Sequence, residues 1–135
     1  KKHYVPGNMQ RLQKEWTGKG VAWVKVLSSK AGKAFVTPAQ ELEYNKANGA
    51  AATASLMDTD QSIARAYGAR TTPHMFVIDP KGVLIYNGAL DDKSGSDSEE
   101  VKTAKNYVSA ALSEALGGKP VTESATKPYG CGVKY

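Results

Sequence analysis

Cysteine is almost absent from this sequence, since Cys131 is the single one in 135 residues. One thiol excludes an internal disulfide and any zinc site built on several cysteines. Long apolar runs are missing as well. No stretch approaches the roughly 20 residues of a membrane-spanning helix, so we expect no membrane segment. The two histidines have no partner at ligand spacing, and no phosphate-binding glycine loop is present. We therefore expect no metal and no cofactor.

Acidic residues are scarce in the first quarter of the chain. Residues 1–33 hold eight Lys or Arg and one acid, Glu15, whereas residues 34–135 hold ten basic and twelve acidic side chains; the two parts carry +7 and −2, which sum to +5. No aromatic residues are interleaved with the basic ones as in nucleic-acid-binding motifs. We interpret the lysines as the solvated face of a first helix, and we expect no nucleic-acid partner.

Helical and strand-like patterns alternate through the first half. Segments 9–20, 37–49 and 59–68 have helical spacing or helix-end signals, while 21–29 and 53–58 are short apolar strands. Thr37 and Pro38 begin the second helix and Gly49 ends it, and Thr59 or Asp60 caps the third. The nearly continuous apolar character of 21–29 predicts a strand buried on both faces of a parallel sheet.

A hairpin and a long helix follow. Segments 74–79 and 83–89 are predicted strands joined by a Pro-Lys-Gly turn, and 98–117 is the longest expected helix, with Ser98 as its N-cap. We expect Trp16, Trp23, Tyr67 and Tyr86 in the core and His3 at the surface. Residues 119–135 have too little periodic apolar content for an element and are predicted to be an irregular tail.

This order of elements predicts an α/β fold, with helices on the faces of a sheet that is parallel where the crossovers are helical and antiparallel at the hairpin. We expect one domain over residues 1–118 and the irregular tail over 119–135.

Several segments resemble one superfamily. The runs "AYGARTTPHMFVID" and "KGVLIYNG", an aspartate pair and an amphipathic helix resemble the thioredoxin-like superfamily, in particular the redoxin branch with alkyl hydroperoxide reductases and thiol-specific antioxidant proteins. The tail "KPYGCGVKY" resembles the end of a bacterial subgroup of uncharacterised redoxin-domain proteins. The first helix is similar to the segment that directly follows the Cys motif of that subgroup. The resemblance implies a thioredoxin-like mixed sheet flanked by helices, here lacking its first strand or strands.

The resemblance also implies a site. It implies a cis peptide between Thr72 and Pro73, in a loop that faces the nucleophilic thiol and pairs with an extended substrate. Arg70, Thr71 and His74 would line the same groove, although a histidine entering a strand is also well explained as a packed, hydrogen-bonded side chain. No residue of the chain matches the family's nucleophilic cysteine. Either a longer parent protein carries it upstream of Lys1, as we expect for a fragment, or this chain has lost it.

Cys131 leaves two interpretations open. It is a resolving or intermolecular thiol, or it packs as a small hydrophobic residue.

Two functions follow from these expectations. The first is a thioredoxin- or peroxiredoxin-like thiol oxidoreductase, acting on peroxide or on a thiol or disulfide protein partner, of which this chain is a fragment that is inactive alone. The second is a non-catalytic module that holds an extended peptide at the proline loop.

We further expect a homodimer through an exposed sheet edge. The family resemblance favours a periplasmic or secreted location over a cytoplasmic one.

Overall fold

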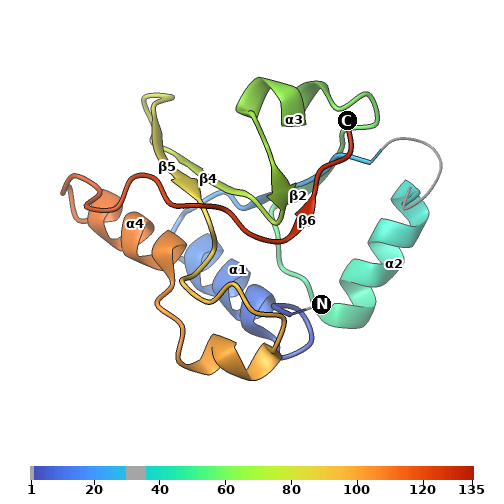
Figure 1. Cartoon of the computed structure of the whole chain (residues 1–135), viewed down its shortest axis with the longest axis horizontal. Helices are drawn as coiled ribbons and strands as arrows, with labels where there is room; N and C mark the ends of the chain where they lie inside the picture. The colour runs from blue at the N-terminus through green and yellow to red at the C-terminus, as the bar shows by residue number, and fades with distance from the viewer. Residues whose placement is uncertain (1, 30–35) are drawn as a thin grey trace. The chain divides into compact units, whose positions relative to one another are not determined.

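The computed structural model describes residues 2–29 and 36–135, which form two compact units. The first unit comprises the residues up to Ala69 together with Lys134–Tyr135, and the second comprises Arg70–Val133. The elements of the first unit are α1 (Asn8–Gly18), β1 (Val24–Leu27), α2 (Pro38–Asn48), β2 (Ala54–Met57) and α3 (Ser62–Tyr67) (Figure 1). Those of the second are β3 (Thr71–Thr72), β4 (Met75–Ile78), β5 (Leu84–Gly88), the 3-10 helix η1 (Ser98–Lys102), α4 (Tyr107–Leu116) and β6 (Cys131–Gly132).

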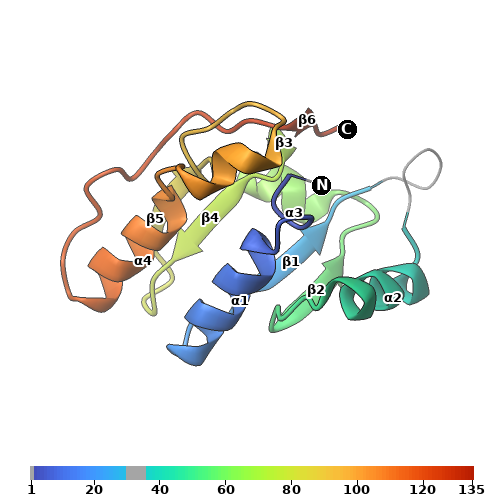
Figure 2. The ribbon, with the colours of Figure 1, turned by 90° about the horizontal axis from the view of Figure 1, so that it is seen from below.

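In the first unit, β1 and β2 pair in parallel, as the crossover through α2 predicts. Helix α2 lies beside these strands (Figure 2), where Lys25 of β1 reaches Glu41 of α2 at 2.6 Å. The α2 caps are those predicted from the sequence. The Thr37 hydroxyl accepts the Gln40 N–H, and Gly49 ends the helix with a φ of 62°.

The prediction that β1 is buried on both faces is wrong. Val24 and Val26 are 46% and 41% exposed, and Leu56 beside them on β2 is 44% exposed. Helix α2 covers the opposite face, where Lys25 and Ser55 meet Glu41. The apolar run 21–29 therefore predicted a strand correctly, but it did not indicate that only one face of the strand is covered.

The start of α3 also differs from the prediction. Neither Thr59 nor Asp60 is its N-cap residue, which is Gln61 in the left-handed region with a φ of 61°. The buried Asp58 accepts the N–H groups of Ile63 and Ala64 at 3.0 and 2.9 Å. Asp60 accepts the Ser62 N–H, at 3.0 Å.

The last two residues of the chain belong to the first unit and contact α3. The Gln61 side chain donates to the Lys134 carbonyl at 2.7 Å, and the Tyr135 hydroxyl donates to the carbonyl of Ala64 at 3.1 Å. The Arg65 guanidinium lies over the Tyr135 ring at 4.5 Å. The end of the chain is thus held by both backbone and side-chain contacts.

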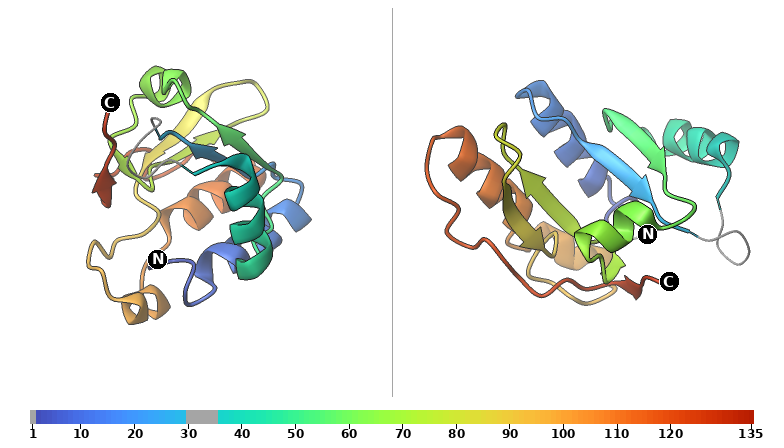
Figure 3. Two further views of the ribbon diagram at one scale, coloured as in Figure 1. Left: turned by 90° about the vertical axis from the view of Figure 1, so that its right-hand side faces the viewer. Right: turned by 90° about the horizontal axis from the view of Figure 1, so that it is seen from above.

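The second unit is organised around the predicted hairpin of β4 and β5. Helix α4 runs beside this hairpin (Figure 3) and buries Val108, Ala111 and Leu112. The single helix predicted over 98–117 is instead divided into η1 and α4. Asp97, not Ser98, caps η1, and Asn106 starts α4 by accepting the Ser109 N–H at 2.8 Å.

The tail contains more order than its composition predicts. Asn87 of β5 donates its N–H to the Ser124 carbonyl at 3.0 Å and accepts the Thr126 N–H at 3.1 Å. Further along, β6 pairs antiparallel with β3. The expectation of a tail without any element is therefore wrong at β6, because its ordering comes from pairing partners distant in sequence. The chain as a whole is an α/β protein, as the order of its elements predicts.

Candidate functional site

The loop at Pro73 connects two strands of the second unit. Thr71 and Thr72 form β3, and β4 begins at Met75. The peptide between Thr72 and Pro73 is cis, as the family resemblance implies. The Thr71 hydroxyl donates to the Pro73 carbonyl at 2.9 Å and closes the turn. Thr72 itself is exposed.

Strand β6 brings Cys131 to this loop. Thr72 lies opposite Cys131 and Thr71 opposite Gly132, and the Val133 N–H donates to the Arg70 carbonyl at 3.0 Å. Cys131 is an exposed free thiol, so the interpretation that it packs as a buried small residue is wrong. The structure thus places an accessible thiol in register with the residue before Pro73.

Close approach of the two backbones depends on Gly130. A Cβ at this position would lie 2.2 Å from the Thr72 carbonyl oxygen, and the φ of 137° is unfavourable for other residues. Gly132, on the other side of Cys131, differs: a Cβ added there would have no atom within 4 Å. One glycine thus permits contact with the loop, whereas the other leaves open space beside the thiol.

Tyr129 anchors the tail two residues before Cys131. Its hydroxyl donates to Asp91, whose carboxylate is 2% exposed and also accepts the Lys93 N–H at 3.0 Å. Burial and the hydrogen bond to Asp91 raise the pKa of Tyr129 far above its usual value. This phenol is therefore a permanent hydrogen-bond donor at neutral pH.

His74 faces into the second unit through both ring nitrogens. Nδ1 accepts the Arg70 N–H at 3.1 Å, and Nε2 lies 2.7 Å from Oδ1 of Asn87. Of the residues predicted to line a substrate groove, Thr72 and Arg70 are exposed, whereas the His74 ring already has two hydrogen bonds within the protein. Asn87 could not be recognised from the sequence, because its role depends on the pairing of β4 with β5.

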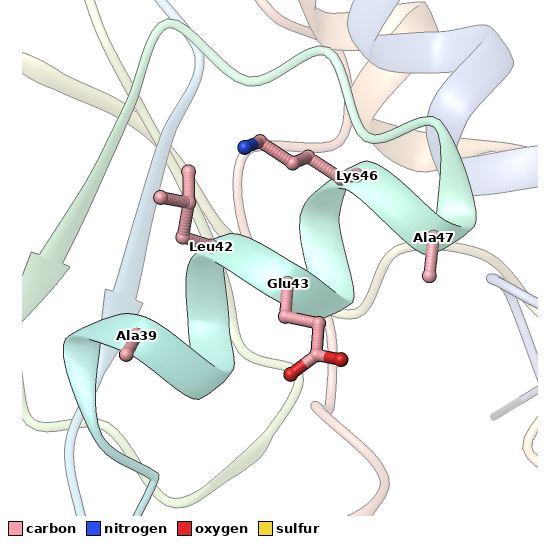
Figure 4. A pocket seen from close by; sticks show the side chains of 5 residues that line it. All are labelled: Ala39, Leu42, Glu43, Lys46 and Ala47. Atoms are coloured by element: carbon pink, nitrogen blue, oxygen red, sulfur yellow. The ribbon is translucent and has the colours of Figure 1, made fainter.

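Surface hollows occur elsewhere, on α2. One is lined by Ala39, Leu42, Glu43, Lys46 and Ala47, with the Leu42 and Lys46 side chains on one side of the helix and Glu43 on another (Figure 4). This open patch has no nucleophile and no converging polar groups, so it offers no chemistry. Within residues 2–29 and 36–135, no three His, Cys, Asp or Glu side chains gather in a possible metal site. No helix in the same residues is long and apolar enough to cross a bilayer.

Two solved structures are similar to this chain. An uncharacterized conserved protein from Geobacillus kaustophilus matches with a TM-score of 0.79 and 29% identity, over 98% of this chain and 69% of that one. A hypothetical protein from Sinorhizobium meliloti 1021 matches with a TM-score of 0.79 and 28% identity, over 98% of this chain and 71% of that one. A scan against family models and a search of the curated proteins found no match. The similarity supports the α/β fold and assigns no activity.

Proposed function

We propose that this chain is a thiol-based redox module in which Cys131 exchanges with a disulfide of a protein partner. The observation that carries the proposal is the pairing of Cys131 with Thr72, beside Pro73, with the thiol exposed. The family resemblance implies that an extended segment pairs with the residue before this proline. In this chain the tail makes that pairing, and the paired residue is the cysteine.

The surroundings of the thiol suit a chain-like partner. Strand β6 pairs on one side with β3, and no other strand of the described chain pairs with its outer edge. Gly130 and Gly132 place no side chain on either side of Cys131. An extended peptide can therefore approach the outer edge of β6 and bond to its backbone by strand addition.

Thiol–disulfide exchange between Cys131 and a partner needs no cofactor. The Cys131 thiolate attacks one sulfur of the partner disulfide, and a new S–S bond forms as the other sulfur leaves as a thiolate and takes up a proton. A second thiol of the partner then attacks the mixed disulfide and releases Cys131. With a peroxide in place of the disulfide, the thiolate would attack one peroxide oxygen, break the O–O bond and become a sulfenic acid as the other oxygen leaves as an alcohol or water. The sulfenic acid would then condense with a partner thiol to a disulfide, releasing water.

The second candidate, a non-catalytic peptide-binding module, is favoured by the same open edge of β6. It differs in needing no thiol. Strand addition at β6 would then occur equally well with serine at position 131.

One experiment separates the two candidates. The chain and its Cys131→Ser variant are incubated with an extended peptide that contains a disulfide, and intact mass and peptide binding are measured. The redox proposal predicts a mixed disulfide in the wild-type chain alone. Binding that is equal in both chains, with no mass change, would favour the binding module. If the peptide does not bind and the mass does not change, both candidates are contradicted.

The homodimer remains a prediction as well. Strand β1 pairs with β2, and in the part of the chain that the structure describes no second strand pairs with β1. An edge strand with exposed Val24 and Val26 favours association between copies. Sedimentation equilibrium should then give a mass that rises with concentration, and a constant monomer mass would contradict this.

A further inference from the structure

The hydrogen bonds of the His74 ring favour one of its two neutral tautomers. A backbone N–H can only donate, so Nδ1, which accepts the Arg70 N–H at 3.1 Å, carries no proton. The proton of the neutral ring then lies on Nε2, which donates to Oδ1 of Asn87 at 2.7 Å. The ring also stacks on Phe76, with centroids 4.4 Å apart and planes 25° from parallel.

Asn87 connects this ring to the tail. It lies on β5 opposite Phe76 of β4. Its side chain accepts from His74, while its backbone groups bond to Ser124 and Thr126. The His74 ring is therefore hydrogen-bonded to the hairpin residue that also holds the tail.

Arg70 connects the ring to the reactive strand. Its N–H is held by His74, and its carbonyl accepts the Val133 N–H at 3.0 Å. Val133 directly follows the two residues of β6. The position of Arg70 thus fixes the end of the strand that aligns Cys131 with Thr72.

We propose that His74 is a positioning residue for Cys131, acting through Arg70 and Val133 rather than through contact with a substrate. Both ring nitrogens are occupied inside the protein, which argues against its expected place among the substrate-binding residues. The relevance of this positioning to exchange depends on the proposed function of Cys131. The positioning itself is a structural claim that is testable without any exchange activity.

Three variants separate the two hydrogen bonds of the ring. His74→Ala removes both bonds. His74→Asn keeps an acceptor close to the position of Nδ1, and His74→Gln keeps a donor close to the position of Nε2. Amide hydrogen exchange of Arg70 and Val133 reports the connection to β6, and the amides of Val77 and Tyr86 report whether the hairpin stays folded. In the wild-type chain, nitrogen NMR of the ring should show a proton on Nε2 and none on Nδ1.

We expect His74→Ala to speed exchange of the Val133 amide by about tenfold, the effect of losing one hydrogen bond, with hairpin amides unchanged. His74→Asn should restore most of the protection, and His74→Gln should not. Faster exchange at Arg70 with no change at Val133 would overturn the proposal, and so would a proton on Nδ1. If the Val133 amide responds as expected but Cys131 forms no mixed disulfide, the positioning stands and the proposed function fails.

Discussion

At the scale of single residues, Gly130 decides whether β6 can pair with β3. We predict that Gly130→Ala separates the strands, because the new Cβ would lie 2.2 Å from the Thr72 carbonyl oxygen. The free energy of opening this pair should fall by about 1–3 kcal/mol. The measurement is hydrogen exchange of the Val133 amide. Gly132→Ala is the matched control. It should leave hydrogen exchange of the Val133 amide unchanged, because the new Cβ would have no atom within 4 Å.

Single residues were also the hardest to place from the sequence. Gly49 was identified correctly as the end of α2, because a helix end is a local signal. His3 was expected at the surface but is 5% exposed and bonds to Asn8, and Tyr67 was expected in the core but is 43% exposed. Tertiary packing decided both positions, and one sequence carries little information about it. Cys131 and Thr72 were each singled out, but their adjacency was not predictable from the chain.

At the scale of elements, Asp58 holds the start of α3. Burial by itself raises the pKa of Asp58, but hydrogen bonds from the Ser28 hydroxyl and from the Ala64 and Ile63 amides outweigh it, so the pKa is lowered. Because the pKa is lowered, the ionised carboxylate stabilises the folded protein at pH values above about 3.9, the pKa of Asp in the unfolded chain. That stabilisation is lost as the pH falls through the folded value.

We therefore predict that Asp58→Asn lowers the free energy of unfolding by about 1–3 kcal/mol at neutral pH. The difference from wild type should shrink as the pH falls from the unfolded-state pKa of about 3.9 through the lower pKa of the folded protein, where the carboxylate becomes protonated. Urea unfolding of both chains at several pH values tests this. Asp60→Asn, which alters an exposed carboxylate on the same turn, should have a small effect throughout. A difference between Asp58→Asn and wild type that does not vary with pH would contradict the account.

The contact between α2 and β1 gives a second prediction at this scale. The Lys25 and Glu41 side chains are only 15% and 8% exposed, and the Lys25 ammonium also donates to Asn45 at 2.7 Å. Glu41→Gln leaves a buried ammonium without its countercharge. It should lower the free energy of unfolding by about 3 kcal/mol.

Glu15→Gln is the matched control for this prediction. Glu15 pairs with Arg11 and Lys19 on the exposed face of α1. Its substitution should cost no more than about 1 kcal/mol in chemical unfolding. Equal effects of the two substitutions would show that the Lys25–Glu41 pair does not stabilise the contact between α2 and β1.

Elements were predicted better than residues because each has a local pattern. The helices α1 and α2 and the β4–β5 hairpin follow from spacing, caps and turn residues. The break between η1 and α4 was missed. It depends on Asn106, which caps α4, and on the Lys105 N–H, which donates to Asp92 thirteen residues earlier. Strand β6 was missed for a similar reason, since two residues carry no periodicity.

At the scale of the whole molecule, the alternation of helices and strands was enough to predict an α/β protein, and two solved structures share the fold. Division into two compact units was not visible in the sequence, which has no linker-like stretch at residue 70. The basic excess of residues 1–33 is consistent with the predicted solvated helix face, since Arg11, Lys14 and Lys19 of this region are exposed.

The central claim is that pairing with Thr72 makes Cys131 selective for an extended disulfide partner. The most direct test compares rates of mixed-disulfide formation with an extended peptide disulfide and with a small disulfide of equal thiol pKa, in wild type and in Gly130→Ala. The account predicts about a tenfold preference for the peptide in wild type, because the aligned strand positions the reacting sulfurs, and loss of that preference in Gly130→Ala. Equal rates for both disulfides in the wild-type chain would contradict it.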